Sequence, residues 1–507
     1  MKRYTLKAPS VRTLKNTNGI APPKLGAGGR TPPKLRVPPG CKARFSEQIL
    51  LRLSILAVTL ASSGSIAAAP VLAQAAARPP AGERQTEPQT LGADRSLVRG
   101  SLSVGQAVQI GLRENLMIRV AKADVGAAEA EMRVMRSMTR PQLSANTYLT
   151  VGSSPNLLST SPNVMPVNTL AVPSNGFADQ NLTLMVPLYT GGRLRNQVRA
   201  ASERQRAASA DVAGVESETA LAIKDAYYRT LLAVELVKVA QARVDASTEL
   251  VRTTRAQFEA GKGIEASVQR VGAELADAQR DVTATQNQKA KSLLDLKAAM
   301  GVSLDSEITL SDALTFVPPA GDLKGSLAEA ARIRPELLAA RLRAGAAQAG
   351  VASVRGSQGP QVYGAAMADL FAPRAMSTNA GGTLGVVISL PLFDGGQRRA
   401  EVDRARAGQA RAEAETQNIE LRVSNEVRQA WLDRDTADQN YRTAQTAVQA
   451  VQAAYDVTLL RVQNQKAILV EQLDALTALI RARANLAQAL YDHALATARL
   501  QRAIGRP

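Results

Sequence analysis

The sequence has few of the side chains on which enzymes and metal sites depend. Its 507 residues include a single cysteine, Cys41, and a single histidine, His493. Cys41 precedes the expected cleavage site of a leader segment, so the mature chain would carry no thiol, which excludes disulfides and thiolate metal sites. A lone histidine within a helical pattern is usually a structural residue. We therefore expect neither a metal nor a cofactor.

Motifs for phosphate binding and nucleophilic catalysis are absent as well. The sequence contains no G-x-x-x-x-G-K-[ST] loop and no G-x-S-x-G elbow. The pairs Gly191-Gly192 and Gly395-Gly396 follow expected strands and precede expected helices, where a phosphate loop could lie, but the remaining glycines of such a loop are missing. These absences predict that the protein is not an enzyme.

The positive charge of the chain is concentrated at its N-terminus. The formal net charge is +18, and residues 1–75 hold twelve Lys or Arg and one Glu, which gives 12 − 1 = +11. The rest of the chain therefore carries only 18 − 11 = +7. This mild balance argues against a dedicated surface for nucleic acid, and we expect no nucleic-acid partner.

Long apolar runs are missing from the mature region, and aromatic residues are rare. No uninterrupted apolar stretch of about 18 residues follows residue 75, so no transmembrane helix is expected, and any contact with a bilayer core would have to be made by strands. Aromatic residues make up 3% of the sequence. This composition suits long helices better than a compact globular core.

The N-terminal segment resembles an export signal. A basic, Pro- and Gly-rich stretch leads to the apolar run LSILAVTL at 53–60, and small residues with a plausible cleavage site follow at 73–75. Residues 76–99 are polar and Pro-rich without periodicity, as in a flexible linker. We divide the chain into a leader at 1–75, this linker, a first repeat at 100–301, a connector at 302–324 and a second repeat at 325–507.

The strongest positive feature is an internal repeat. VPLYTGGRLRNQVRAA at 186–201 aligns with LPLFDGGQRRAEVDRA at 390–405, so the offset is 390 − 186 = 204 residues. The alignment continues without a gap to the end of the chain. A register kept over this length indicates two copies of one unit of fixed geometry.

Each repeat predicts the same order of elements: a helix, two alternating strands and two long helices. The first repeat predicts a helix over 101–140, strands over 141–151 and 182–188 around a loop at 153–178, and helices over 193–259 and 265–299. The second predicts a helix over 327–353, strands over 362–370 and 384–392, and helices over 397–462 and 469–502. A breaker-free helix over 193–259 would be on the order of 100 Å long, and it needs coiled-coil neighbours along its sides.

Four strands of about ten residues can each cross a bilayer when tilted, but four cannot close a barrel. Open sheet edges are not tolerated in lipid, so several chains must pool their strands. Two chains would supply eight strands and three would supply twelve, and only the larger barrel leaves a lumen.

The sequence resembles the bacterial outer-membrane efflux proteins of the TolC type over about residues 100–507. The resemblance rests on the doubled P-L-[YF]-x-G-G element, on Ala226-Tyr227 and Ala430-Trp431 midway along the long helices, and on the Arg-Ala-Ile-Gly ending at 502–505. It implies a mainly α fold with transmembrane β structure: a trimeric 12-stranded β-barrel continuous with a long α-helical barrel, in which each chain is an internal duplication.

The resemblance also implies a function. It predicts a homotrimeric exit duct in the outer membrane, with its helical barrel in the periplasm, that serves a tripartite efflux or type I secretion system. The implied partners are a periplasmic adaptor protein, an inner-membrane pump or ABC transporter, and outer-membrane lipid. The alternative is a periplasmic or secreted structural coiled-coil protein without a channel, which would have no use for the two apolar-alternating hairpins. The sequence does not specify the cargo.

Strand periodicity predicts two different sheet faces. We expect one face to contact acyl chains: Leu182, Leu184, Val186, Leu188, Val386, Ile388, Leu390 and Leu392. We expect Thr183, Thr383 and Ser389 to face the lumen. The strand-to-helix turns should be formed by Pro187, Gly191, Gly192, Pro391, Gly395 and Gly396, since glycine accepts the backbone angles of such a reversal.

In the family, the turns between the paired long helices dock the adaptor. Here these turns are Ala260-Gly261-Lys262 and Asn464-Gln465-Lys466, so the second repeat lacks the glycine, and Lys262 stands where an apolar residue is common. A bulky residue at Gly261 is expected to abolish transport and leave the trimer intact. The alternative is that Gly261 only terminates a helix.

A periplasmic gate is expected at Glu471 and Asp474. They lie three residues apart, so their carboxylates project from one helix face. The segment LVEQLDA is similar to the family segment whose acidic positions ring the narrow end of the tunnel. Six carboxylates from three chains would attract cations, and Arg270, at the position that matches Asp474, could supply part of the compensating charge. The alternative is that both carboxylates only solvate an exposed helix face.

Overall fold

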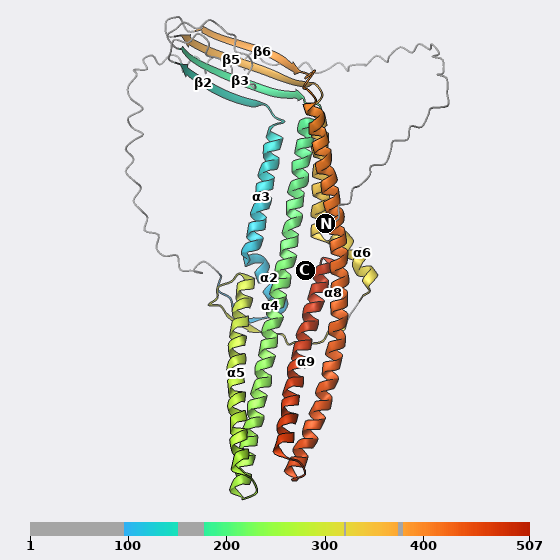
Figure 1. Ribbon diagram of the computed structural model, residues 1–507. Coiled ribbons are helices and arrows are strands. Elements are labelled where there is room, and N and C mark those ends of the chain that lie inside the picture. Colours follow the sequence, from blue (N-terminus) through green and yellow to red (C-terminus); the bar gives the residue numbers. More distant parts are fainter. Residues whose placement is uncertain (1–95, 151–176, 319–320, 374–378, 507) are drawn as a thin grey trace, which may run out of the picture. The chain divides into compact units, whose positions relative to one another are not determined.

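The computed structural model describes residues 96–150, 177–318, 321–373 and 379–506, all within a compact unit that begins at Pro88. The expected leader at 1–75, nearly all of the linker and the hairpin loop at 153–178 apart from its last two residues lie outside the described residues. Figure 1 shows a sheet at one end of this unit and long helices that run away from it. Among the described helices, none is long and apolar enough to cross a membrane.

The four predicted strands form one antiparallel sheet in the order β2-β3-β5-β6. The strands are β2 (Gln142–Thr150), β3 (Phe177–Tyr189), β5 (Gln361–Pro373) and β6 (Asn379–Ser389). The two hairpins thus lie side by side through β3 and β5, and β2 and β6 are the edge strands. The alternation predicted through Leu392 is wrong at its end, because β6 stops at Ser389, before Pro391, whose nitrogen has no hydrogen to donate to a strand ladder.

The long helices confirm the predicted duplication. The helices α4 (Arg193–Glu259) and α8 (Gln397–Gln463) have 67 residues each, and α5 (Glu265–Met300) and α9 (Leu469–Ile504) have 36 each. Buried core residues recur at the 204-residue offset: Ile223 and Val427, Leu296 and Leu500, Met300 and Ile504. Two copies of one helical hairpin therefore share one packing pattern.

The shorter predicted helices are each divided in two. The first repeat has α2 (Val104–Glu114) and α3 (Leu116–Ser137), and the second has α6 (Leu323–Ile333) and α7 (Pro335–Gly356). A single helix over 101–140 was therefore the wrong prediction, because the Asn115 side chain accepts a hydrogen bond from the Met117 N–H and starts a new helix. A single helix over 327–353 was also wrong, because Pro335 disfavours helical angles at Arg334.

The connector contains structure that the sequence did not reveal. The strand β4 (Glu307–Leu310) pairs in parallel with β1 (Arg99–Leu102). The buried Tyr227 hydroxyl donates to the Leu102 carbonyl over 2.8 Å, and the Val104 N–H donates to the Asp312 carboxylate over 2.8 Å. These bonds fasten the start of the first repeat to the connector, midway along α4.

The helices form a single layer rather than a closed core. Next to the sheet the order of contacts is α3-α4-α7-α8, and away from the sheet it is α5-α4-α9-α8. The helix α4 thus has neighbours on both sides, whereas α3 and α5 form one lateral edge and α8 forms the other (Figure 1).

The four long helices end in the same hydrogen-bonded motif. At the end of α4, the Lys262 N–H donates to the Gln257 carbonyl over 2.8 Å, and at the end of α8 the Lys466 N–H donates to the Arg461 carbonyl over 2.7 Å. The residue before each lysine is left-handed: Gly261 has φ 73°, and Gln465 has φ 57°. This is the Schellman motif, which satisfies the last carbonyls of a helix and normally uses glycine.

The ends of α5 and α9 use Gly301 and Gly505 in the same way, with φ 76° and 96°. Gln465 is the only non-glycine residue with positive φ among the described residues. A left-handed conformation strains a side chain that carries a Cβ atom, so the second turn keeps its geometry at an energetic cost.

The only histidine packs against the connector. The Phe316 ring lies 4.5 Å from the Tyr441 ring and 4.6 Å from the His493 ring, centroid to centroid. His493 is 1% exposed, and this burial lowers the pKa of its imidazole below the ordinary 6.5, an effect that the charge of Arg434 adds to and that of Asp438 opposes. Folding therefore favours the neutral form of this imidazole over its protonated form.

The first prediction concerns acid stability. Because the pKa of His493 is lower in the folded state, the unfolded state takes up the proton first. The free energy of unfolding should therefore show no loss from His493 above about pH 6.5, the ordinary histidine pKa. It should fall as the pH drops below that value toward the folded-state pKa. Thermal unfolding of the detergent-solubilised protein between pH 5 and 8 would measure this, with His493→Asn as the comparison. An equally steep decline in the variant would contradict the assignment.

The second prediction concerns the strained turn. Gln465→Gly should stabilise the end of α8 by about 1 kcal/mol, because glycine adopts positive φ without strain. Hydrogen exchange at the Lys466 amide would report it as slower exchange. The matched control is Gln463→Gly, in the helical last turn, which should destabilise by about 0.5–1 kcal/mol. Faster exchange in Gln465→Gly would show that the turn is not strained.

Candidate functional site

One face of the sheet is apolar. Because directly paired residues of an antiparallel sheet lie on the same face, the register joins Leu143, Leu184, Ala366 and Leu384 across all four strands. The same face carries the following additional residues: Ala145, Leu182, Val186, Val362, Ala368, Val386 and Ile388. Of the residues that strand periodicity predicted for one face, Leu182, Leu184, Val186, Val386 and Ile388 share that face by register, and Leu188 lies at the register shift between Pro187 and Tyr189.

The other face is more polar. Thr183 pairs with Ser144 and Met367, which in turn pairs with Thr383, so the two predicted lumen threonines lie on one face. On this face the Asn146 side-chain amide donates to the Asn181 side-chain carbonyl over 3.1 Å. Ser389, the last residue of β6, pairs with Gln361 and shares this face.

The two faces differ in exposure. On the central strands, Leu182 of the apolar face is 38% exposed, whereas Asn181 and Ala365 of the polar face are 5% and 8% exposed. On the edge strand β6, residues of both faces are exposed: Leu384 (87%) and Ile388 (69%) on the apolar face, and Thr383 and Ser389 on the polar face. The difference between the faces is therefore confined to the central strands. Within the described chain nothing covers the apolar residues Leu384 and Ile388 of β6.

The strand-to-helix turns place glycine where the backbone requires it. Gly191 and Gly192 have φ 59° and 82°, and Gly395 and Gly396 have φ 64° and 93°. A Cβ atom on Gly191 would lie 2.3 Å from the Gly356 carbonyl oxygen, at the end of α7, whereas one on Gly395 would meet nothing within 4 Å in the chain. Pro187 lies at a register shift of β3, and Pro391 follows β6.

The proposed gate residues are exposed on the first turns of α9. The Glu471 carboxylate lies 3.6 Å from the Arg461 guanidinium of α8, so within one chain its charge is partly compensated. Asp474 is exposed, while Gln472 between them is buried. In the described part of the chain, Arg270 on α5 forms no ion pair with either carboxylate within one chain, and its compensating role in an assembly stays a prediction. The Arg461–Glu471 pair was not expected from the sequence.

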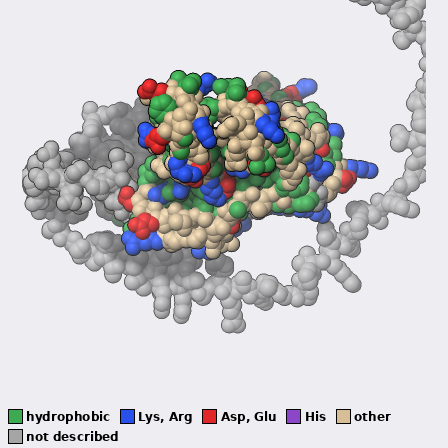
Figure 2. Space-filling model, turned by 90° about the horizontal axis from the view of Figure 1, so that it is seen from below, with side chains coloured by type: hydrophobic (Ala, Val, Ile, Leu, Met, Phe, Trp, Pro, Cys, Tyr) green, Lys and Arg blue, Asp and Glu red, His purple; other side chains and the backbone are tan. Residues whose placement is uncertain are grey.

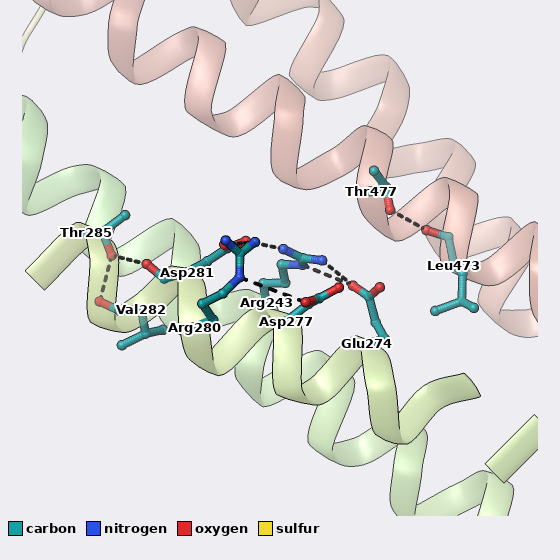
Figure 3. A network of polar contacts seen from close by, with 9 residues as sticks. All are labelled: Arg243, Glu274, Asp277, Arg280, Asp281, Val282, Thr285, Leu473 and Thr477. Carbon is teal, nitrogen blue, oxygen red and sulfur yellow. Dashed lines mark hydrogen bonds and ion pairs between the residues drawn. The ribbon is translucent and has the colours of Figure 1, made fainter. Parts of the chain in front are cut away.

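A network of ion pairs between α4 and α5 was also not predicted from the sequence. Arg243 of α4 donates through Nε to the Glu274 carboxylate of α5 over 3.1 Å and also bonds Asp281, which in turn contacts Arg280 over 3.1 Å (Figure 3). The corresponding positions of the second repeat, such as Ala447 and Ala478, carry no charge. The ion pairs that Arg243 makes between α4 and α5 thus have no counterpart at the matching positions of α8 and α9.

No group of three or more His, Cys, Asp or Glu side chains suited to hold a metal ion occurs among the described residues. The features that stand out are instead a two-faced sheet, two glycine turns, and two exposed turns between long helices. Figure 2 views the end of the molecule that carries these helix turns, where basic and hydrophobic side chains lie next to one another.

Comparison with known proteins agrees with these features. The sequence model of the family described as outer membrane efflux protein matches residues 107–302 and 327–506. Outer membrane efflux protein BepC of Brucella suis biovar 1 (strain 1330) is 22% identical over 401 residues, 78% of this chain and 83% of its own length. Fusaric acid resistance protein FusA of Burkholderia cepacia is 26% identical over 298 residues, 57% of this chain and 55% of its own length.

The fold is shared with a solved channel. The structure of the outer-membrane channel OprN superposes with a TM-score of 0.66 at 23% identity, over 82% of this chain and 94% of that chain. This likeness confirms the mainly α fold with an added sheet. The two matched segments fall on the two repeats, and the chain, a protein of the outer membrane, belongs to the outer membrane efflux protein family.

Proposed function

We propose that three copies of this chain form a passive exit duct through the outer membrane. The observation that carries the proposal is the sheet: one face is apolar and exposed at Leu384 and Ile388, the other face is more polar, and the sheet is continuous with the helices α4 and α8. A sheet of this kind fits a wall between lipid and a water-filled lumen.

Closure of the wall follows from the sheet edges. In an antiparallel sheet of four strands, β2 and β6 run in opposite directions, so β6 of one copy can pair antiparallel with β2 of the next. Three copies would give twelve strands with no free edge, which a bilayer requires. In the same way, α8 of one copy would pack against α3 and α5 of the next and close a helical barrel in the periplasm.

The duct would be one part of a larger export system. We propose that a periplasmic adaptor docks at the turns 260–262 and 464–466 and joins the duct to an inner-membrane pump or ABC transporter. The related protein FusA is named for resistance to fusaric acid, a small molecule, which favours small-molecule efflux over type I secretion of polypeptides as the use of this chain. A coiled-coil protein without a channel is disfavoured, because it would leave the apolar sheet face exposed to water.

Catalysis is not part of the proposal. The family is one of channels, and neither the two-faced sheet nor the helix turns assemble a nucleophile with a base. Export energy would come from the inner-membrane partner, and the residues of this chain would provide a wall, a gate and a docking end.

The third prediction tests the wall. Leu184→Arg or Ile388→Arg should impair assembly, because arginine on the lipid face costs about 2–4 kcal/mol near the bilayer midplane. The matched controls are Thr183→Arg and Ser389→Arg, because these neighbouring residues lie on the opposite face of the sheet. Both control variants should assemble. The measurement is the amount of heat-modifiable trimer in outer-membrane fractions. Wild-type amounts of trimer in both lipid-face variants would refute the wall.

The fourth prediction tests the gate. With Glu471→Ala and Asp474→Ala combined, the duct should lose cation selectivity and block by multivalent cations, since a ring of carboxylates attracts cations. Arg461→Ala is the opposite control: it removes the positive partner of Glu471 and should raise cation selectivity. Planar-bilayer recordings give both values. Unaltered selectivity in the double variant would leave the two carboxylates as ordinary surface charges.

A further inference from the structure

The two turns at the free end of the long helices share two side chains despite their divergence. The first turn, 260–264, reads Ala-Gly-Lys-Gly-Ile, and the second, 464–468, reads Asn-Gln-Lys-Ala-Ile. At the 204-residue offset only the lysine and the isoleucine are identical. Each turn therefore presents a Lys-x-Ile element in which x is a small residue.

The isoleucines occupy positions that local stability does not explain. Ile264 and Ile468 are the N-caps of α5 and α9, and neither makes a side-chain capping bond. An N-cap is normally Ser, Thr, Asp or Asn, and an apolar residue there forgoes about 1 kcal/mol. Both isoleucines are nevertheless exposed, by 66% and 63%. A large apolar side chain held in water at two equivalent positions indicates a surface that is covered in an assembly.

The lysines are available for a partner. Lys262 and Lys466 are exposed, and among the described residues neither ammonium group forms an ion pair. A cation beyond a helix C-terminus is favoured by about 0.3–1 kcal/mol, which accounts for a positive charge but not for the isoleucine beside it. Arg461, by contrast, is already engaged by Glu471.

The backbone presents both elements in the same way. The left-handed residue before each lysine is kept even where it is Gln465, and the isoleucines have similar extended angles, φ −112° and ψ 145° against φ −97° and ψ 157°. The middle residue of the first turn is closely packed, because a Cβ atom on Gly263 would lie 3.2 Å from the Phe258 backbone nitrogen. Two sequences thus maintain one shape.

We propose that these two Lys-x-Ile elements, Lys262 with Ile264 and Lys466 with Ile468, bind a protein that presents a carboxylate beside an apolar socket. The inference rests on the proposed docking function of these turns and adds the chemistry of the partner. Glu259 and Glu265 flank Lys262 in the sequence, so a uniformly anionic surface such as a lipid bilayer would be repelled there, and a single carboxylate per lysine fits better.

The experiment uses the full chain in cells that produce it. Cells without the chain first define the compounds whose tolerance depends on it, and these compounds are the probes. The double variant K262E/K466E should lower tolerance to these compounds by about tenfold, because like charges juxtaposed at an interface cost several kcal/mol. Ile264→Ser with Ile468→Ser should act in the same direction. Lys324→Glu, an exposed lysine on α6 far from the turns in sequence, is the matched control, and outer-membrane amounts of each variant are measured in parallel.

Two further variants keep the test decisive. If K262E/K466E fails to reach the outer membrane, K262M/K466M removes the charge without reversing it and should also lower tolerance, and arginine at both positions should restore most of that loss. Mutations that restore tolerance to K262E/K466E should change Asp or Glu to a neutral or basic residue in one other periplasmic protein. Restoring mutations confined to lipid synthesis or to this chain would overturn the proposal.

Gly261→Trp separates this inference from the docking function itself. If that variant loses tolerance while K262E/K466E keeps it, the turns dock a partner but not through an acidic surface, and the inference is overturned alone. If both variants keep wild-type tolerance, docking at the turns is refuted and the inference falls with it.

Discussion

Nearly every long element of the described chain has a side that the chain itself does not cover. The sheet ends in two edge strands whose outer N–H and C=O groups lack partners from the described chain, and the helical layer ends at α3 and α5 on one side and at α8 on the other. In lipid an unpaired backbone group costs several kcal/mol, so the sheet cannot remain open where it meets a membrane. The apolar face, the two open sheet edges and the single helical layer all fit the proposed closure of the wall by further copies of the chain.

The internal duplication shows how different side chains can serve one position. The last turn of α5 exposes the Ala299 carbonyl, to which the Asn115 side chain donates over 2.9 Å, and the corresponding Ala503 carbonyl of α9 accepts from Arg334 over 2.9 Å. Asparagine is neutral, but Arg334 is 3% exposed and therefore needs counter-charges, which Glu336 and Glu426 supply. The second repeat thus replaces one amide with a buried ion-pair cluster, in which truncation of a single partner would be costly.

Much of the fold could be predicted, because it depends on local patterns. The ends of α4 could be predicted from the absence of helix-breaking residues within it and from the glycines beside it. Which strand residues share a face could be predicted from strict alternation. What could not be predicted depends on contacts distant in sequence or on backbone strain. The β1–β4 ladder joins segments 208 residues apart, the Arg461–Glu471 pair depends on how two helices wind around each other, and nothing in the residue type marks Gln465 as left-handed. The break before Pro335, by contrast, was marked in the sequence by the proline itself, but the helical periodicity on both sides of it led to the prediction of a single helix.

The equal lengths of the paired helices have a consequence for how such a chain can change. Both repeats leave the sheet through a glycine pair and continue for 67 residues, turn, and return for 36. Removing two heptads from each of the two long helices of one repeat alone would draw its turn back by about 20 Å relative to the other, at about 1.5 Å per residue. Reach across the periplasm can therefore evolve only by matched insertions or deletions in both halves of the gene. The β2–β3 hairpin, free of this constraint, is 15 residues longer than its counterpart: 335 − 116 = 219 residues separate the starts of α7 and α3, but 397 − 193 = 204 separate those of α8 and α4.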